Sequence, residues 1–425
     1  MFFREIIFSV YSTKTLTMAG GLMQLVAYGA QDVYLTGNPK VTFFQAVYKR
    51  HTNFAMENIE QTVNGTPAAD GRVSVTIARN GDLVADMYVE MSAKAAGCDD
   101  EADAWLAEKA VKTAELSVGG QRIDKHYQRW WRLYSELYLD EGKKLSYGKA
   151  TSATQAGEKI YLPLIFFFNR NPGLALPLIA LQYHEVRLDF DLSSQFGTLM
   201  EGFKVWANYV YLDTEERRRF AQKGHEYLIE QVQHTGTDSV AGSGETQKRL
   251  SYNHPVKELV FCLEASAGTA NTWNFTSDAD AICTSNISAY TSATDRAVIA
   301  TGATGAPLVV AKGDVWTEGS AGELDSFKLV LNGQDRMKEQ GGKYYNTVQP
   351  FVHHSGAPMP GVYSYSFALK PEEHQPTGTC NFSRIDNAQV SIKGKSAYDK
   401  TLSMFATNYN VLRIQSGMGG LAFSN

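Results

Sequence analysis

The sequence predicts an all-β protein made of two similar antiparallel domains in tandem, with a few short helices in the loops. Its 425 residues exceed one ordinary hydrophobic core and suit two domains of roughly 200 residues each. Leu116–Ile123 has an echo in Leu329–Arg336, about half the chain later, and each contains a Gly-Gln turn after an apolar stretch. An apolar strand follows each copy, at Tyr161–Phe168 and at Tyr363–Leu369. The second half is therefore expected to repeat the fold of the first.

Individual strands are predicted from hydrophobic residues that recur at every second position. In the first half, Val186, Leu188, Phe190 and Leu192 alternate with Arg187, Asp189 and Asp191. In the second half, Leu259, Phe261 and Leu263 repeat the pattern. Turn sequences such as Gly119-Gly120 and Asn332-Gly333 separate the strands. Many short strands with such turns are typical of β-sandwiches, and we expect two eight-stranded jelly rolls, that is, a double jelly roll.

One helix stands out, at residues 128–140. Trp130, Leu133, Tyr134, Leu137 and Tyr138 share one face at helical spacing. We expect this helix to lie in a long loop and to cover part of the sandwich, with its aromatic side chains in the core.

The domain boundaries follow from changes in composition. The first jelly roll is assigned to residues 41–213 and the second to residues 214–425. Residues 265–322 are rich in Ala, Thr, Ser and Gly with little periodicity, which predicts a long exposed loop of the second domain. Residues 1–17 are interpreted as an upstream extension, because Met18 opens a distinct glycine-rich segment.

Composition argues against several functional classes. The net charge of −5 and the pI near 6.0 give no basic surface for direct nucleic-acid binding. The four cysteines are far apart and form no CxxC pair, so neither a disulfide framework nor a zinc site is expected. The longest apolar tract, residues 160–181, includes Arg170 and three prolines and is unsuited to a membrane-spanning helix.

No catalytic, cofactor or metal site is predicted. None of the nine histidines forms an H-x-H pair or a compact metal-ligand motif. Asp189 and Asp191 share a strand face, but that face lies opposite the core and suits solvent or an interface. Residues 217–219 are three arginines after two glutamates, which favours local ion pairs. Residues 417–420 resemble a phosphate loop in composition only, because too few residues follow to form its helix.

Candidate glycosylation sites are the N-x-S/T triplets at Asn64, Asn274 and Asn286. The last two lie in the predicted exposed loop, where a sugar could be accommodated. A fourth triplet, at Asn381, falls in a predicted strand segment and is less suitable.

Several long blocks of sequence resemble the major capsid proteins of nucleocytoplasmic large DNA viruses, with those of algal viruses most similar. The blocks that carry the resemblance run in order from residue 18 to the C-terminus: residues 18–39, 42–44, 48–54, 119–127, 163–169, 172–185, 331–336, 365–371, 378–387 and 409–423. Residues 1–17 have no counterpart in this pattern, and residues 265–322 match only loosely.

The resemblance implies a structural subunit of a virion, without enzymatic activity or cofactor. It implies a homotrimer with a pseudo-hexagonal outline that tiles an icosahedral shell beside neighbouring capsomers. Residues 18–40 would lie on the inner capsid face and contact neighbouring capsomers or minor capsid and penton proteins, above an internal membrane that the chain does not span. Synthesis in the host cytoplasm is expected, and cytoplasmic or viral transferases would have to add any glycans.

Two other functions remain open at this point. Jelly rolls are common among carbohydrate-binding proteins, so a lectin-like surface protein is the first alternative. A jelly-roll enzyme of the cupin kind is the second, and it would need a bound metal or a catalytic His or Asp.

Overall fold

The structure is a computed structural model that describes residues 20–94, 105–153, 155–242, 244–265, 298–301, 307–310, 322–395 and 399–423. The chain divides into two compact units, Met1–Thr52 and Asn53–Asn425. The predicted sites Asn274 and Asn286 lie outside the described residues, as does most of 265–322.

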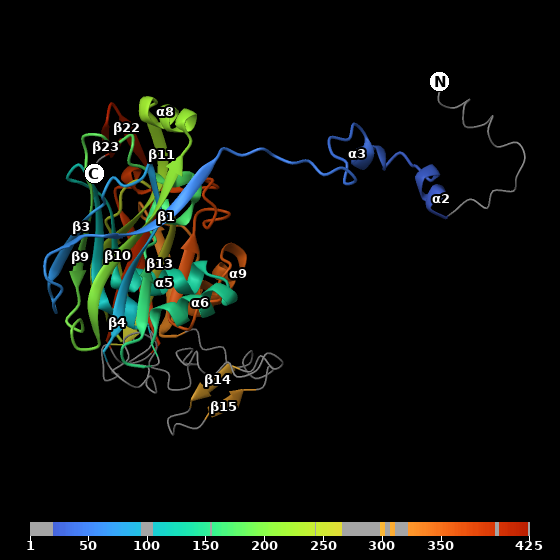
Figure 1. Cartoon of the computed structure of the whole chain (residues 1–425). Helices are drawn as coiled ribbons and strands as arrows, with labels where there is room; N and C mark the ends of the chain where they lie inside the picture. The colour runs from blue at the N-terminus through green and yellow to red at the C-terminus, as the bar shows by residue number, and fades with distance from the viewer. Residues whose placement is uncertain are drawn as a thin grey trace, which may run out of the picture. The chain divides into compact units, whose positions relative to one another are not determined.

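Strands between residues 54 and 212 form a sandwich of two antiparallel sheets (Figure 1). Sheet 1A has the order β1 (Phe54–Gln61), β10 (Met200–Leu212), β4 (Leu83–Ala93) and β7 (Lys159–Pro163), with β8 (Leu176–Pro177) paired to β4. Sheet 1B has the order β2 (Val63–Asn64), β3 (Arg72–Thr76), β9 (Val186–Leu192), β5 (Val111–Val118) and β6 (Gln121–Tyr127).

Strands between residues 225 and 421 form a second sandwich. Sheet 2A has the order β11 (His225–Val240), β22 (Lys400–Gln415), β13 (Pro255–Ala265) and β19 (Val362–Ser366), with β20 (Cys380–Asn381) paired to β13 and β23 (Met418–Leu421) paired to β22. Sheet 2B has the order β12 (Glu245–Leu250), β21 (Ala388–Gly394), β16 (Leu324–Leu331) and β17 (Gln334–Asp335), with β18 (Gln340–Gly341) paired to β16. Within the predicted loop, β14 (Val298–Thr301) and β15 (Pro307–Val310) form a separate hairpin.

The two sandwiches have the same connectivity. When the eight main strands of each are numbered along the chain, the sheet orders are 1-8-3-6 and 2-7-4-5 in both. This pattern is the jelly roll, so the predicted all-β double jelly roll is confirmed. The additional strands are short pieces such as the two-residue β2 and β8. The echo found in the sequence falls on equivalent hairpins, β5–β6 and β16–β17.

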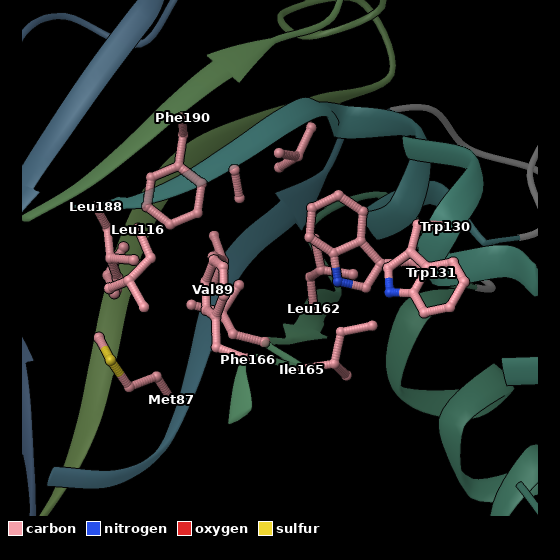
Figure 2. Packing of buried hydrophobic residues seen from close by; sticks show 14 of the residues in the cluster. Met87, Val89, Leu116, Trp130, Trp131, Leu162, Ile165, Phe166, Leu188 and Phe190 are labelled. Atoms are coloured by element: carbon pink, nitrogen blue, oxygen red, sulfur yellow. The ribbon is translucent and has the colours of Figure 1, made fainter. Parts of the chain in front are cut away.

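The first core lies between the facing sheets (Figure 2). Met87 and Val89 of β4 point toward Leu188 and Phe190 of β9, and all four side chains are buried. Each lies at an alternate position of its strand, so the period-2 pattern places one face of each sheet in this core. Leu116 of β5 completes the contact from sheet 1B.

Helices occupy the connections between strands. The predicted helix at 128–140 is present as α5 (Gln128–Tyr138), directly after β6. It is followed by α6 (Glu141–Thr151), whose N-cap Asp140 accepts a hydrogen bond from Lys143 N at 2.8 Å. The other helical elements are α4 (Leu106–Ala110), α7 (Phe167–Arg170), η2 (Pro172–Leu174), α8 (Thr214–Gln222), the π-helical turn η4 (Tyr344–Val348), α9 (Gln349–His353) and η5 (Phe382–Arg384).

The N-terminal unit contains α2 (Gly20–Val26) and α3 (Val33–Thr36). Asp32 precedes α3 and accepts a hydrogen bond from Gly29 N at 2.8 Å. Across the described residues of the chain, every helix is too short or too polar to cross a membrane.

Candidate functional site

The two jelly rolls meet along a seam in which β6 and α5 of the first cover the outer face of sheet 2A. Leu259, Phe261 and Leu263 of β13 point into the core of the second sandwich. The alternating residues Val260 and Cys262 belong to the hydrophobic cluster of the first. Sheet 2A is therefore buried on both faces, and α5 lies beside β13 (Figure 1).

Aromatic rings form the centre of the seam. Trp130 of α5 packs on Phe405 of β22, with ring centroids 5.6 Å apart. His234 of β11 stacks on the same Phe405 at 4.3 Å, and Tyr127 contacts His234 edge to face at 4.9 Å. Burial lowers the pKa of His234, which favours the neutral imidazole among these rings. The helix predicted to cover its own sandwich thus also joins the two domains.

Polar groups fix the register of the seam. Asp124 of β6 accepts a hydrogen bond from Val232 N of β11 at 3.0 Å, and its other carboxylate oxygen lies 2.9 Å from His126 Nε2. At the start of α5, the Arg129 guanidinium binds both carboxylate oxygens of Glu264, with Nη2 2.6 Å from Oε2. Such two-point pairing restricts orientation as well as distance.

The end of α5 and the helix after it, α6, both make hydrogen bonds to the segment that follows α9. Gly356 N donates to Leu137 O at 3.0 Å, and Lys144 Nζ donates to Ala357 O at 2.6 Å. A Cβ built on Gly356 would lie 2.4 Å from Glu136 O and 2.7 Å from Leu137 O. The close approach of the two backbones therefore requires glycine at this position.

A buried ion network crosses the seam beside these contacts. Arg170 of the first jelly roll lies 2.9 Å from Glu230 of the second, and Lys257 Nζ lies 2.8 Å from the same carboxylate. Burial opposes ionisation of Glu230, but Arg170 and Lys257 outweigh it and hold the pKa of this carboxyl below its usual value. Burial lowers the pKa of Lys257 to about 8, against the pull of Glu230. Separating the partners of a buried ion pair strongly destabilises a protein, because each charge is then buried without compensation. These pairs therefore restrict the seam to one arrangement.

His354 lies between two carboxylates at the end of α9. Its Nε2 is 3.1 Å from Glu258 and its Nδ1 is 3.3 Å from Glu372. Burial alone would lower the pKa of His354, but Glu258 and Glu372 raise it to about 9. The side chain is therefore an imidazolium at neutral pH and neutralises part of the buried negative charge.

Comparison with known proteins identifies this two-domain arrangement. Residues 42–213 match the family described as "Major capsid protein N-terminus", and residues 216–420 match "Large eukaryotic DNA virus major capsid protein". The major capsid protein of Paramecium bursaria Chlorella virus 1 is 45% identical, over 96% of this chain and 100% of the relative. The chain belongs to the major capsid protein family of large eukaryotic DNA viruses. The relative from Pyramimonas orientalis virus is 41% identical with the same coverage.

Solved structures agree with this membership. A chain of the PBCV-1 virus capsid superposes with a TM-score of 0.75 and 40% identity, over 90% of this chain and all of that one. The Faustovirus major capsid protein shares the fold, with a TM-score of 0.67 at 14% identity. The chain is accordingly a structural capsid protein of the virion rather than an enzyme, and it assembles into capsomers of the shell. A carbohydrate-binding function is not favoured by these relatives.

The structure describes three of the places that the sequence analysis singled out: Asn64, the pair Asp189 and Asp191, and residues 417–420. Asn64 is exposed on β2, within its Asn-Gly-Thr triplet. Asp189 and Asp191 are ion-paired rather than poised for catalysis, since both approach Arg72, at 3.5 and 3.8 Å. Residues 417–420 form the turn and strand of the β22–β23 hairpin. Among the described residues, no group of three His, Cys, Asp or Glu side chains is placed to hold a metal ion.

Sequence reasoning missed the charged part of the seam. Arg170, Glu230, Lys257 and His354 are far apart along the chain, and no spacing rule joins them. The only signal was Arg170 itself, a charge inside the longest apolar tract, since such a residue is rarely buried without a partner.

Proposed function

We propose that this capsid protein forms homotrimers with a pseudo-hexagonal outline, which tile an icosahedral shell. The observation that supports this is the identical strand order of the two jelly rolls. Three chains with two similar units each place six similar units around a three-fold axis. A ring of six such units has a nearly hexagonal outline, and hexagons tile a flat facet. Residues 41–213 and 214–425 are the proposed units.

The N-terminal segment is proposed to act in assembly on the inner capsid face. Large apolar residues of this segment, residues 18–40, are between 50% and 92% exposed in the single chain: Leu22, Met23, Leu25, Val26, Tyr28, Val33, Tyr34 and Leu35. So much exposed apolar surface marks an interaction segment. Its proposed partners are neighbouring capsomers and minor capsid or penton proteins, above an internal membrane that the chain does not span.

The contact of the shell with the genome and the place where the subunit is made are also proposed, from the net charge and from the family. The net charge of −5 supports a shell without direct contact to the genome. The subunit is proposed to be made in the host cytoplasm before it enters the virion.

Negative-stain electron microscopy of the purified protein tests the capsomer proposal. Particles with a hexagonal outline and three-fold symmetry are expected. A variant that lacks residues 20–40 should still give these particles but should fail to form larger arrays. Particles without three-fold symmetry would refute the trimer, and normal arrays from the deletion variant would refute the assembly role of the segment.

Glycans are proposed at Asn64, Asn274 and Asn286, and residues 265–322 are proposed to form an exposed outer loop. Exposure of Asn64 supports the first site. Protein isolated from virions should exceed the mass of the unmodified chain, and Asn64→Gln should remove one increment of it. An unmodified mass would refute all three sites. Deletion of residues 268–318 should leave trimers intact, whereas loss of folding would show that the segment belongs to the core.

A further inference from the structure

The outer face of sheet 1A is the counterpart of the face that the seam covers on sheet 2A. In sheet 2A, Phe405 of the eighth strand pairs with His234 and Val260. In sheet 1A, Trp206 of the eighth strand pairs with Glu60 and Tyr88. Both sheets therefore place an aromatic residue at the centre of the face that points away from their own core.

The face of sheet 1A is partly apolar and partly exposed in the single chain. Trp206 stacks on Tyr88 with centroids 6.5 Å apart, and Tyr161 meets Tyr88 edge to face at 5.8 Å. These three rings are only half-buried, and Met56 on the neighbouring β1 is 54% exposed. Trp206 Nε1 donates to Glu90 at 2.8 Å, which holds the indole in place. We call the three rings of Trp206, Tyr88 and Tyr161 the Trp206 stripe. It is an ordered aromatic surface of the kind that protein interfaces bury.

Within one chain, the segment between the fifth and sixth main strands covers sheet 2A. That segment begins with α5, whose third residue, Trp130, packs on Phe405. The corresponding segment of the second jelly roll lies between β17 and β19 and contains η4 and α9. The third residue of α9 is Phe351, and both helices begin with glutamine.

Unlike α5, α9 presents its apolar residues to solvent in the single chain. Phe351 is 88% exposed, Val352 is 61% exposed and Val348 is 45% exposed. Leu369, 74% exposed, lies next to them, since its carbonyl oxygen is 3.0 Å from His353 Nδ1. Four large apolar side chains gathered on one short surface are typical of a buried contact in an assembly.

We propose that α9 of one copy packs on the outer face of sheet 1A of the next copy, with Phe351 against the Trp206 stripe. This contact between two chains has the same form as the contact that α5 makes with sheet 2A within one chain. It is a head-to-tail contact, so three copies close a ring in which intrachain seams and interchain contacts alternate. This inference rests on the trimer proposed above and adds the two surfaces that would build it.

Cross-linking tests which surfaces meet. The double variant Glu60→Cys/Val352→Cys carries one thiol beside Trp206 and one on α9, and leaves both proposed aromatic anchors intact. A short bis-maleimide should convert it into covalent dimers and trimers on a denaturing gel. With Cys98, Cys283 and Cys380 replaced by serine in every protein compared, the parent chain, each single variant and the control Glu60→Cys/Met418→Cys should remain monomeric. Met418 is a matched exposed apolar residue, 52% exposed on β23.

A second measurement uses the anchor itself. Phe351→Asp should raise the concentration at which half of the trimer dissociates by about thirtyfold or more, as for a residue at the centre of an interface. Met418→Asp should leave it unchanged, and circular dichroism should show folded protein in both.

The outcomes separate this inference from the trimer proposal. If the wild type is trimeric but the Glu60→Cys/Val352→Cys variant gives no cross-linked ladder, the inference alone is overturned. A Phe351→Asp variant as trimeric as the wild type would have the same consequence. The stripe would then be covered by the N-terminal segment or by another protein. A wild type that is monomeric at all concentrations would overturn both proposals.

Discussion

Substitution of Gly356 by alanine tests the geometry of the seam directly. The added Cβ would lie 2.4, 2.7 and 2.8 Å from the carbonyl oxygens of Glu136, Leu137 and Leu139. All three are backbone atoms, so relief requires α5 and the 355–359 segment to separate. Overpacking costs about 1–3 kcal/mol, and loss of the Gly356 N to Leu137 O hydrogen bond adds about 1 kcal/mol. Gly356→Ala should therefore destabilise the protein by about 2–4 kcal/mol.

Guanidinium unfolding followed by tryptophan fluorescence is the suitable assay, because Trp130 packs on Phe405 in the seam and Trp131 is the next residue of α5. Gly142→Ala is the matched control. A Cβ at this helix position would have its nearest neighbour at 4.0 Å, so the substitution should stabilise the folded protein by about 0.4–1 kcal/mol. If the free energy of unfolding of Gly356→Ala lay within about 0.5 kcal/mol of the wild-type value, the seam geometry inferred from this close approach would be wrong.

The remaining predictions concern the buried charges and the core. Arg170→Met should destabilise the chain by about 3–5 kcal/mol in urea unfolding, because it removes one partner of a buried pair; a loss below about 1 kcal/mol would contradict this. The pKa of His354 is raised to about 9, so its stabilisation is complete below about pH 6.5 and is lost as the pH rises through 9. His354→Gln should therefore lose more stability at pH 6 than at pH 9.5. An equal loss at both pH values would refute this. Leu188→Ala should cost about 2–5 kcal/mol in thermal unfolding, and a smaller loss would show that the first core relaxes around the cavity.

The strands were predictable because their signal is local. In β9, apolar residues at every second position lie between the two sheets of the first core, as the alternation requires. The repeated Gly-Gln turn also predicted two equivalent hairpins, since Gly119, Gly120 and Gly333 all adopt the positive φ that tight turns favour. Helix α5 was predicted to within two residues at its end.

The seam was not predictable in the same way. The spacing of α5 indicated an apolar face but could not show that Trp130 packs on Phe405, 275 positions later. Arg129, Arg132 and Glu136 on the same helix look like solvent-exposed charges in sequence, yet the last two are buried and Arg129 pairs with Glu264. Helix α9 has five residues and contains a proline, so it falls below the length at which periodicity is informative. Contacts between distant short segments leave no local pattern.

The measurement that tests the central claim most directly is the native mass of the purified protein. Native mass spectrometry should show a species of three times 46.9 kDa, increased by any glycans. That result would support a capsid subunit that closes its own three-fold ring. A stable species of 46.9 kDa at all accessible concentrations would contradict the account, because the exposed α9 surface and the stripe on sheet 1A would then have no partner among copies of this chain.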